Sequence, residues 1–174
     1  MLSSIAVSFI LGLASLTHAA PAAFAPRASI SDIGDAQNGW AADTSRVSQF
    51  LSAAPNLSGT ALTSQAQAAL DSELDELTRK AVLDGQFGND ASIQEAGATL
   101  SRPDTFQFVV DGLRQLATQG AGMSAAEVNA LVSQINATRC KNVLPAIDAY
   151  FRVASGFLNN GLTALANRPD NCPQ

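Results

Sequence analysis

Apolar residues recur at intervals of three and four along most of this 174-residue chain, and this spacing is typical of amphipathic helices. The first helix is predicted over residues 29–53, where Gln37 and Thr44 interrupt the apolar stripe. Ser29 followed by Asp32 indicates a capping box at its start. The stripe consists of Ile30, Ile33, Trp40, Val47 and Leu51.

A second helix is predicted over residues 61–83, ending at Asp84-Gly85. Its inward face is expected to hold Leu62, Ala66, Leu70, Leu74, Leu77 and Ala81. The other face is acidic and could bind a cation, but its carboxylates do not share one side of the helix and no glycine turn of the EF-hand type accompanies them. We therefore interpret it as a solvated face, with Glu76 and Lys80 as a favourable i,i+4 pair. That face holds Asp71, Glu73, Asp75, Glu76, Arg79 and Lys80.

Four further helices follow from the same periodicity. The first of them is predicted over about residues 91–100, and the second from 104 or 105 to Gly120. The third begins after a capping box at Ser124 and Glu127, and the last covers about 143–160. Pro145 is tolerated in the first turn of the last one. The short loops between them predict an all-α antiparallel bundle of five to six helices, formed as one domain over residues 29–174.

Residues 1–19 are interpreted as a secretory signal peptide, because an apolar run over 5–13 precedes the small-x-small sequence Thr17-His18-Ala19. The alternative is a membrane anchor, but the run is shorter than the roughly 20 apolar residues that a span needs. Residues 20–28 are expected to form a flexible leader. The mature protein is thus predicted to be extracellular or cell-wall associated, without a transmembrane segment.

Two cysteines, Cys140 and Cys172, are predicted to form a disulfide, which is the default state in a secreted chain. It would clamp the tail to the start of the last helix. A redox or nucleophilic cysteine is the alternative, and it needs an activating neighbour. Asn56 and Asn136 each begin an N-glycosylation sequon.

Cleavage of the signal peptide would remove His18, the only histidine of the chain. Composition then excludes Ser-His-Asp, Cys-His and His-metal sites, and no P-loop, GxSxG or GxGxxG motif occurs. The ten basic residues are scattered in a chain of net charge −5, which argues against a nucleic acid partner. We predict a protein that is not an enzyme and uses no cofactor or metal; catalysis by carboxylates alone stays open.

The chain combines a short signal peptide, a helical domain rich in Ala, Ser and Leu, an acidic net charge and only two cysteines. In this layout it resembles small secreted proteins of filamentous fungi, and in general character it is similar to the hydrophobic-surface-binding and cell-wall galactomannoprotein families. The resemblance implies a helical bundle that binds apolar surfaces or lipids. The chain differs from these families in two respects: it does not show the Ser/Thr-rich anchored tail of some members, and its pair of cysteines is a departure from them. No functional residue is carried over.

Many expected core positions are alanine, so the bundle could either enclose an apolar cavity or pack its helices closely. Our leading hypothesis is a non-catalytic protein that binds a lipid-like ligand or a hydrophobic surface. The alternative is a secreted effector or inhibitor that acts through a protein partner. The residues expected to line the ligand site are Trp40, Phe106, Tyr150, Phe151 and Phe157.

Cleavage of the signal peptide is expected to leave a mature chain that begins at or near Ala20. N-terminal sequencing of the secreted protein checks this. A chain that still starts at Met1, or that stays in the membrane fraction, would contradict the predicted localisation.

Overall fold

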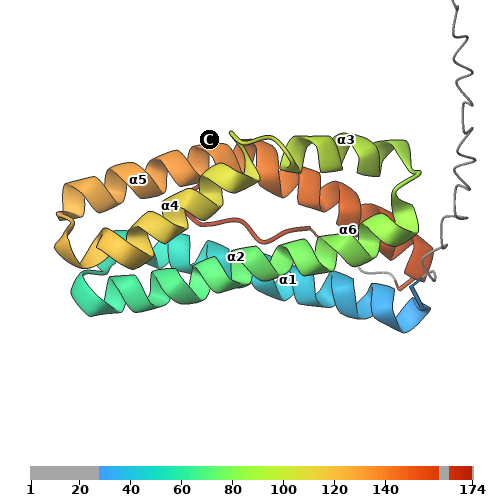
Figure 1. Ribbon diagram of the computed structural model, residues 1–174, viewed down its shortest axis with the longest axis horizontal. Coiled ribbons are helices and arrows are strands. Elements are labelled where there is room, and N and C mark those ends of the chain that lie inside the picture. The colour runs from blue at the N-terminus through green and yellow to red at the C-terminus, as the bar shows by residue number, and fades with distance from the viewer. Residues whose placement is uncertain (1–27, 161–164, 174) are drawn as a thin grey trace, which may run out of the picture.

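The computed structural model describes residues 28–160 and 165–173, so the predicted signal peptide and nearly all of the leader lie outside it. All regular structure in these two ranges is helical, which confirms the predicted all-α bundle (Figure 1). The helices are α1 (Ile30–Ala53), α2 (Gly59–Phe87), α3 (Ala91–Leu100), α4 (Phe106–Gln119), α5 (Ala125–Thr138) and α6 (Leu144–Leu158). Within the described part, no helix has both the length and the apolar character of a membrane span.

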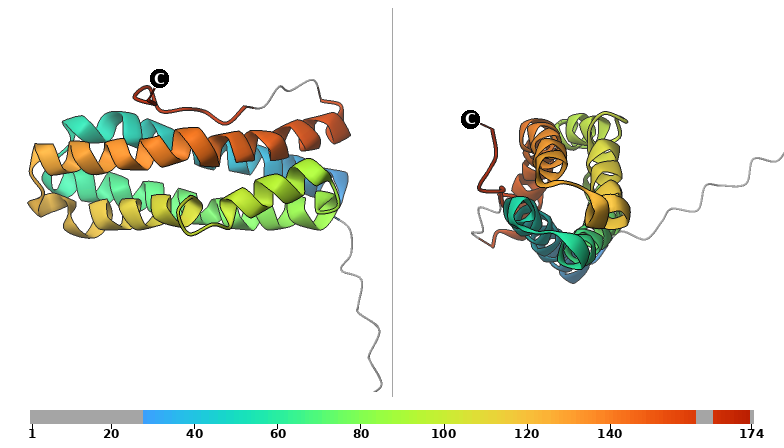
Figure 2. Two further views of the ribbon diagram at one scale, coloured as in Figure 1. Left: turned by 90° about the horizontal axis from the view of Figure 1, so that it is seen from above. Right: turned by 90° about the vertical axis from the view of Figure 1, so that its left-hand side faces the viewer.

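The helices form four antiparallel rods around one core (Figure 2). α1 and α2 are the first two rods, and α3 and α4 follow each other along the third. α5 and α6 make up the fourth rod, because a π-helical turn, Arg139–Val143, joins them without a loop. Each rod packs on two others, α1 on α2 and α6, and α4 on α2 and α5.

Local signals at helix starts are confirmed by the structure. The Ser29 side chain accepts from the backbone N–H of Asp32, whose carboxylate accepts from the Ser29 N–H in return. Ser124 and Glu127 form the same capping box at the start of α5. Both boxes satisfy N–H groups that a helix leaves without an intrahelical partner.

The predicted end of the second helix is wrong, since α2 continues beyond Asp84 and Gly85 to Phe87. Lys80 pairs with Asp84 at 2.5 Å rather than with Glu76, and this i,i+4 pair spans the predicted end. Phe87 is buried, and its ring contacts that of Phe157 at 5.4 Å. Burial of this aromatic ring extends the helix past a glycine that local propensity would use as a stop.

The predicted inward face of this helix is also wrong in its middle. Leu74 and Leu77 are 40% and 47% exposed, whereas Glu73 and Glu76 are fully buried. The acidic residues therefore do not form one solvated face. The stripe that faces the core alternates steps of four and three, and it consists of Leu62, Ala66, Ala69, Glu73, Glu76, Lys80, Leu83 and Phe87. Such a stripe is the heptad seam of closely aligned helices.

The π-helical turn follows from Pro145, which stands near the start of α6 and has no N–H to donate. Its ring would collide with the carbonyl of Lys141 in a regular helix, and the wider turn avoids this collision. The N–H of Leu144 donates to the carbonyl of Arg139, five residues back. The turn keeps the rod continuous and presents Arg139 to the core.

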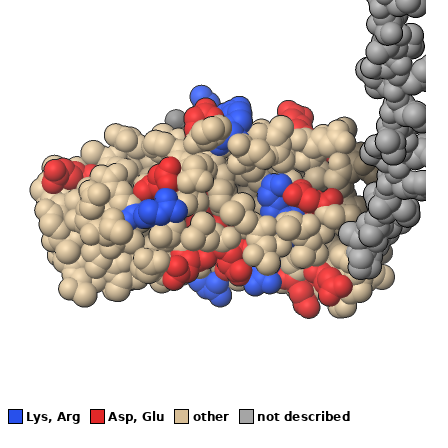
Figure 3. Space-filling model, viewed as in Figure 1, with Lys and Arg blue, Asp and Glu red and all other residues tan. Residues whose placement is uncertain are grey.

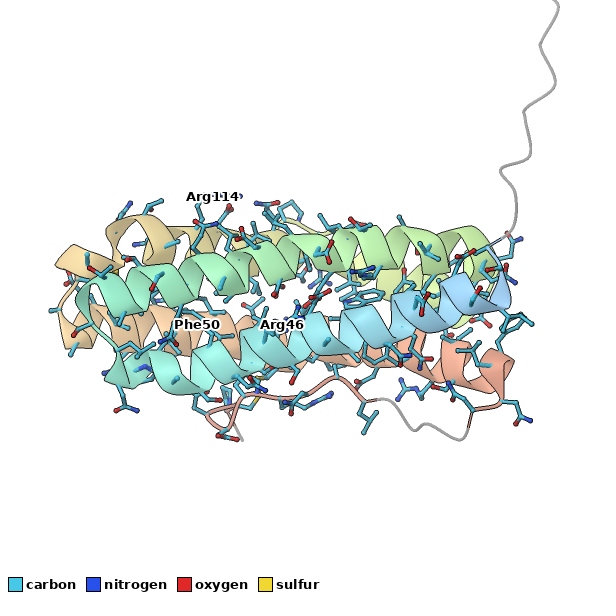
Figure 4. All side chains as sticks on the ribbon, turned by 90° about the horizontal axis from the view of Figure 1, so that it is seen from below. Arg46, Phe50 and Arg114 are labelled. Atoms are coloured by element: carbon cyan, nitrogen blue, oxygen red, sulfur yellow. A yellow bond between two sulfur atoms is a disulfide. The ribbon has the colours of Figure 1, made fainter. Side chains whose placement is uncertain are left out.

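Residues 165–173, here called the C-terminal strap, run alongside α1 (Figure 4). The predicted disulfide is confirmed, and it fixes Cys172 of the strap to Cys140 of the π-helical turn. Asn171 donates to the carbonyl of Leu51 at 3.1 Å and accepts a hydrogen bond from Asn136. Asn136 is buried, so in this fold its side chain is not accessible for a glycan, whereas Asn56 is exposed.

Replacing both cysteines with serine is expected to lower the free energy of unfolding by about 3.5–4 kcal/mol, since the disulfide closes a loop of 32 residues. This corresponds to a fall in Tm on the order of 10 °C for a domain of this size. Helical circular dichroism should persist, because the rods bury a core without the strap. Thermal melts check this, with reductant as the control that shifts only the wild type. An unchanged Tm or a complete loss of helicity would contradict the expectation.

Candidate functional site

A cluster of three charged side chains lies in the middle of the bundle, and none of them is exposed to solvent. Arg139 reaches inward from the π-helical turn and lies 3.5 Å from Glu73 and 3.6 Å from Glu76. Its guanidinium also donates to the hydroxyl of Ser48 at 2.8 Å and to the carbonyl of Thr44 at 3.4 Å. The cluster thus joins α1, α2 and the fourth rod.

Trp40 extends this cluster toward the aromatic core. Its indole N–H donates to the carboxylate of Glu76 at 2.8 Å. The ring packs on Tyr150 at 5.1 Å and against the edge of Phe151 at 5.7 Å. The indole is therefore fixed in orientation at both of its ends, as is usual for a buried Trp whose N–H finds an acceptor.

Two buried carboxylates share one guanidinium in this cluster. Burial raises the pKa of Glu73, and it raises the pKa of Glu76 well above the ordinary value, with the charge of Glu73 adding to the effect. Arg139 opposes both shifts. Arg139 supplies one positive charge for two buried carboxyl groups, so a proton on Glu76, whose pKa is raised the more, makes the cluster of three electrically neutral.

Charged groups around the cluster lie in pairs of opposite sign. Asp43 on α1 is buried and lies 2.6 Å from Arg46 and 3.8 Å from Arg79. Arg79 also pairs with Asp75 at 2.9 Å. Figure 4 labels Arg46 on α1, and Figure 3 shows that charged side chains are sparse on one face of the bundle, with acids and bases often side by side.

A pocket of about 240 Å³ opens beside the cluster, where the third rod is interrupted between α3 and α4. The linker over residues 101–105 is held by Thr105, whose buried hydroxyl lies 2.6 Å from the carbonyl of Thr99. The lining residues come from α1, α2 and both sides of the linker. They are Trp40, Glu76, Leu77, Lys80, Leu100, Ser101, Arg102, Phe106 and Gln107.

The lining divides by chemistry and exposure. Trp40 and Glu76 are buried and form the inner end of the pocket, next to the buried cluster. Leu100 and Phe106 are also nearly buried, while Leu77 is half-exposed. The polar residues at its mouth include Lys80, which pairs with Asp84, and Arg102, which pairs with Asp104 at 3.2 Å. The pocket is thus largely apolar, with one buried acid at its inner end.

The structure separates the aromatic residues that the sequence grouped as ligand lining. Trp40 and Phe106 line the pocket together. Tyr150 and Phe151 lie behind Trp40 and support its ring, and the hydroxyl of Tyr150 donates to Asp84 at 2.6 Å. Phe157 lies elsewhere, is 48% exposed and contacts Phe87.

Sequence reasoning missed the contribution of α2 to this site. The sequence-based interpretation places Glu76 and Lys80 on the solvated face, although the heptad spacing from Leu62 to Phe87 includes both positions. That spacing was the available signal, but the neighbouring leucines gave a more apolar stripe. Across the described ranges, no group of three or more His, Cys, Asp or Glu side chains could hold a metal ion.

Comparisons of the chain with protein-family models, with curated proteins and with solved structures found no match. A protonated Glu76 can donate one hydrogen bond into the pocket, and an ionised Glu76 can accept one or pair with a cation.

Stability of the folded protein is expected to fall as the pH rises above the ordinary glutamate pKa of 4.5, because the folded state keeps a proton on Glu76 that the unfolded state has lost. The decrease approaches about 1.4 kcal/mol per pH unit for one proton, and it ends at the higher pKa of the folded state. Urea unfolding between pH 4.5 and 8 measures it. Glu76→Gln, which mimics the protonated side chain, should flatten this dependence.

The matched control is Glu127→Gln, since this capping carboxylate is exposed and its hydrogen bonds to Ser124 lower its pKa. It should leave the slope above pH 4.5 unchanged. Equal slopes in the wild type and the Glu76→Gln variant would show that Glu76 is ionised in the folded protein.

Proposed function

We propose that this protein is a secreted, non-catalytic binding protein that holds a small, largely apolar ligand in the pocket beside Trp40. The observation that carries the proposal is the pocket itself, in which Leu77, Leu100 and Phe106 surround a fixed indole. Ligand sites are typically concave and apolar, with a few polar groups that orient the ligand. Glu76 is such a group here.

The volume of the pocket limits the size of the ligand. A cavity of about 150 Å³ holds a molecule the size of benzene, and this pocket measures about 240 Å³. A substituted single ring or a short alkyl chain therefore fits inside. A longer lipid-like chain would have to continue outside the pocket, where Leu77 and the exposed Leu74 lie one turn apart on α2.

The second candidate function is binding of a protein partner, and the same two leucines favour it. Leu74 and Leu77 are exposed although both are large and apolar. Only Leu77 also lines the pocket. This difference makes the two residues a matched pair that separates a pocket ligand from a surface partner.

Titration with toluene or with a medium-chain fatty acid such as octanoic acid is expected to change Trp40 fluorescence saturably, because Trp40 is the only indole of the chain. The ligand should also raise Tm, by an amount that corresponds to about 2.7 kcal/mol at a hundredfold excess over Kd. Leu77→Gln should weaken binding about fivefold to tenfold, as expected for the loss of one partly buried apolar contact.

Leu74→Gln is the control and should leave the affinity for these probes unchanged, since Leu74 does not line the pocket. If none of the probes changes fluorescence or Tm, the pocket does not bind apolar ligands and the proposal is overturned. Equal weakening by both variants would place the probes on the exposed surface of α2 instead.

A further inference from the structure

The buried cluster next to the inner end of the pocket contains two carboxyl groups and one guanidinium. Glu73 and Glu76 are both completely buried, and Arg139 is the cation that lies between them. Within the described residues, both carboxylate oxygens of Glu73 and Oε1 of Glu76 have no well-formed hydrogen bond, and the guanidinium of Arg139 lies 3.5 Å from Glu73 and 3.6 Å from Glu76. Of the two glutamates, only Glu76 lines the pocket.

We infer that the ligand of this pocket is an amine, whose apolar part contacts Leu77, Leu100 and Phe106 and whose ammonium group pairs with the carboxylate of Glu76. The inference rests on the proposed function, because it requires that the pocket binds a ligand at all. It goes further by stating the chemical class of that ligand.

Charge balance in the cluster supports an amine. Arg139 balances the charge of Glu73, so without ligand the buried region is neutral when Glu76 holds a proton. When an ammonium group enters, the proton of Glu76 leaves to solvent and the new carboxylate pairs with the ammonium, which keeps its own protons. The buried region is electrically neutral before and after binding, and a buried charge that is paired avoids most of the desolvation penalty.

Trp40 lines the pocket beside the same carboxylate, to which its indole N–H donates. The face of an indole attracts an ammonium group, so a cation that reaches Glu76 across the ring face gains a second contact. A ring substituent of the ligand would at the same time contact Leu100 and Phe106. The inner end of the pocket can therefore recognise a cation and an apolar group side by side.

The other charged groups near Glu76 have partners of their own. On α2, Lys80 pairs with Asp84, and within the linker Arg102 pairs with Asp104. On α1, Asp43 is occupied by Arg46 and Arg79. From the π-helical turn, Arg139 is shared with Glu73, and on α6 the hydroxyl of Tyr150 donates to Asp84 rather than to Glu76.

Three ligands of one size test the inference: benzylamine, benzyl alcohol and toluene. Isothermal titration calorimetry near pH 6.5, in buffers of different ionisation enthalpy, measures affinity and proton release together. Benzylamine is expected to bind at least tenfold more tightly than benzyl alcohol and to release about one proton. Its affinity should rise with pH, by up to tenfold per unit, until Glu76 is ionised in the free protein.

Two variants test whether the preference for benzylamine depends on Glu76. Glu76→Gln should remove the preference for benzylamine over benzyl alcohol, and circular dichroism with thermal melts checks that the variant is folded. Glu73→Gln is the matched control, because Glu73 does not line the pocket. When the charge of Glu73 is removed, Glu76 is expected to be ionised beside Arg139 in the free protein, so benzylamine should bind without releasing a proton.

The wild-type measurements decide the outcome even if a variant does not fold. Binding of toluene and benzyl alcohol without a preference for benzylamine would overturn the amine and leave the proposed function standing. Tight benzylamine binding without proton release, or a preference that persists in Glu76→Gln, would also overturn the inference. Binding of none of the three would overturn both proposals.

Discussion

The ion cluster of Arg139, Glu73 and Glu76 determines how the second helix sits in the bundle. α2 carries two stripes that could face the core, one with Leu70, Leu74 and Leu77 and one with the two glutamates. Full burial of a leucine contributes about 1.5–3 kcal/mol, so hydrophobicity alone favours the leucine stripe. The guanidinium of Arg139 has no other carboxylate within ion-pair distance among the described residues, and leaving it unpaired would cost about 3–5 kcal/mol. The rotation of α2 that buries Glu73 and Glu76 satisfies this cation.

The position of Arg139 in turn depends on the π-helical turn that Pro145 imposes. Arg139 and Cys140 are adjacent in this turn; one enters the core and the other holds the C-terminal strap. Ser48 connects the two, because its hydroxyl accepts from Arg139 and donates to the carbonyl of Asn167 in the strap. The covalent clamp and the buried ion cluster therefore support one another across α1, and neither is an isolated feature.

Local chemistry was sufficient to predict much of the fold. Ser29 with Asp32 and Ser124 with Glu127 define helix starts through hydrogen bonds within four residues, so no tertiary information is needed. The rotation of α2 could not be predicted, because its two stripes differ by one residue and the partner that selects between them, Arg139, lies more than sixty residues away. The pocket was missed in part for the same reason. Trp40 and Phe106 were identified by their aromatic character, whereas Glu76 and Leu77 follow from the rotation.

Two features depart from an ideal bundle, the buried acidic pair of α2 and the break between α3 and α4, and they lie at the same place. A buried acidic pair is tolerated in a core when its charge is balanced, and a break in a rod is tolerated when its backbone groups are satisfied, as those of the linker are by Thr105. Either could have arisen anywhere along a bundle of this length. The break between α3 and α4 lies at the pocket that Trp40 and Glu76 line, so the buried acid lies directly behind an opening in the surface of the bundle. Natural sequences depart from consistent packing mainly where function requires it, and this is why the proposed binding site is the pocket beside Glu76.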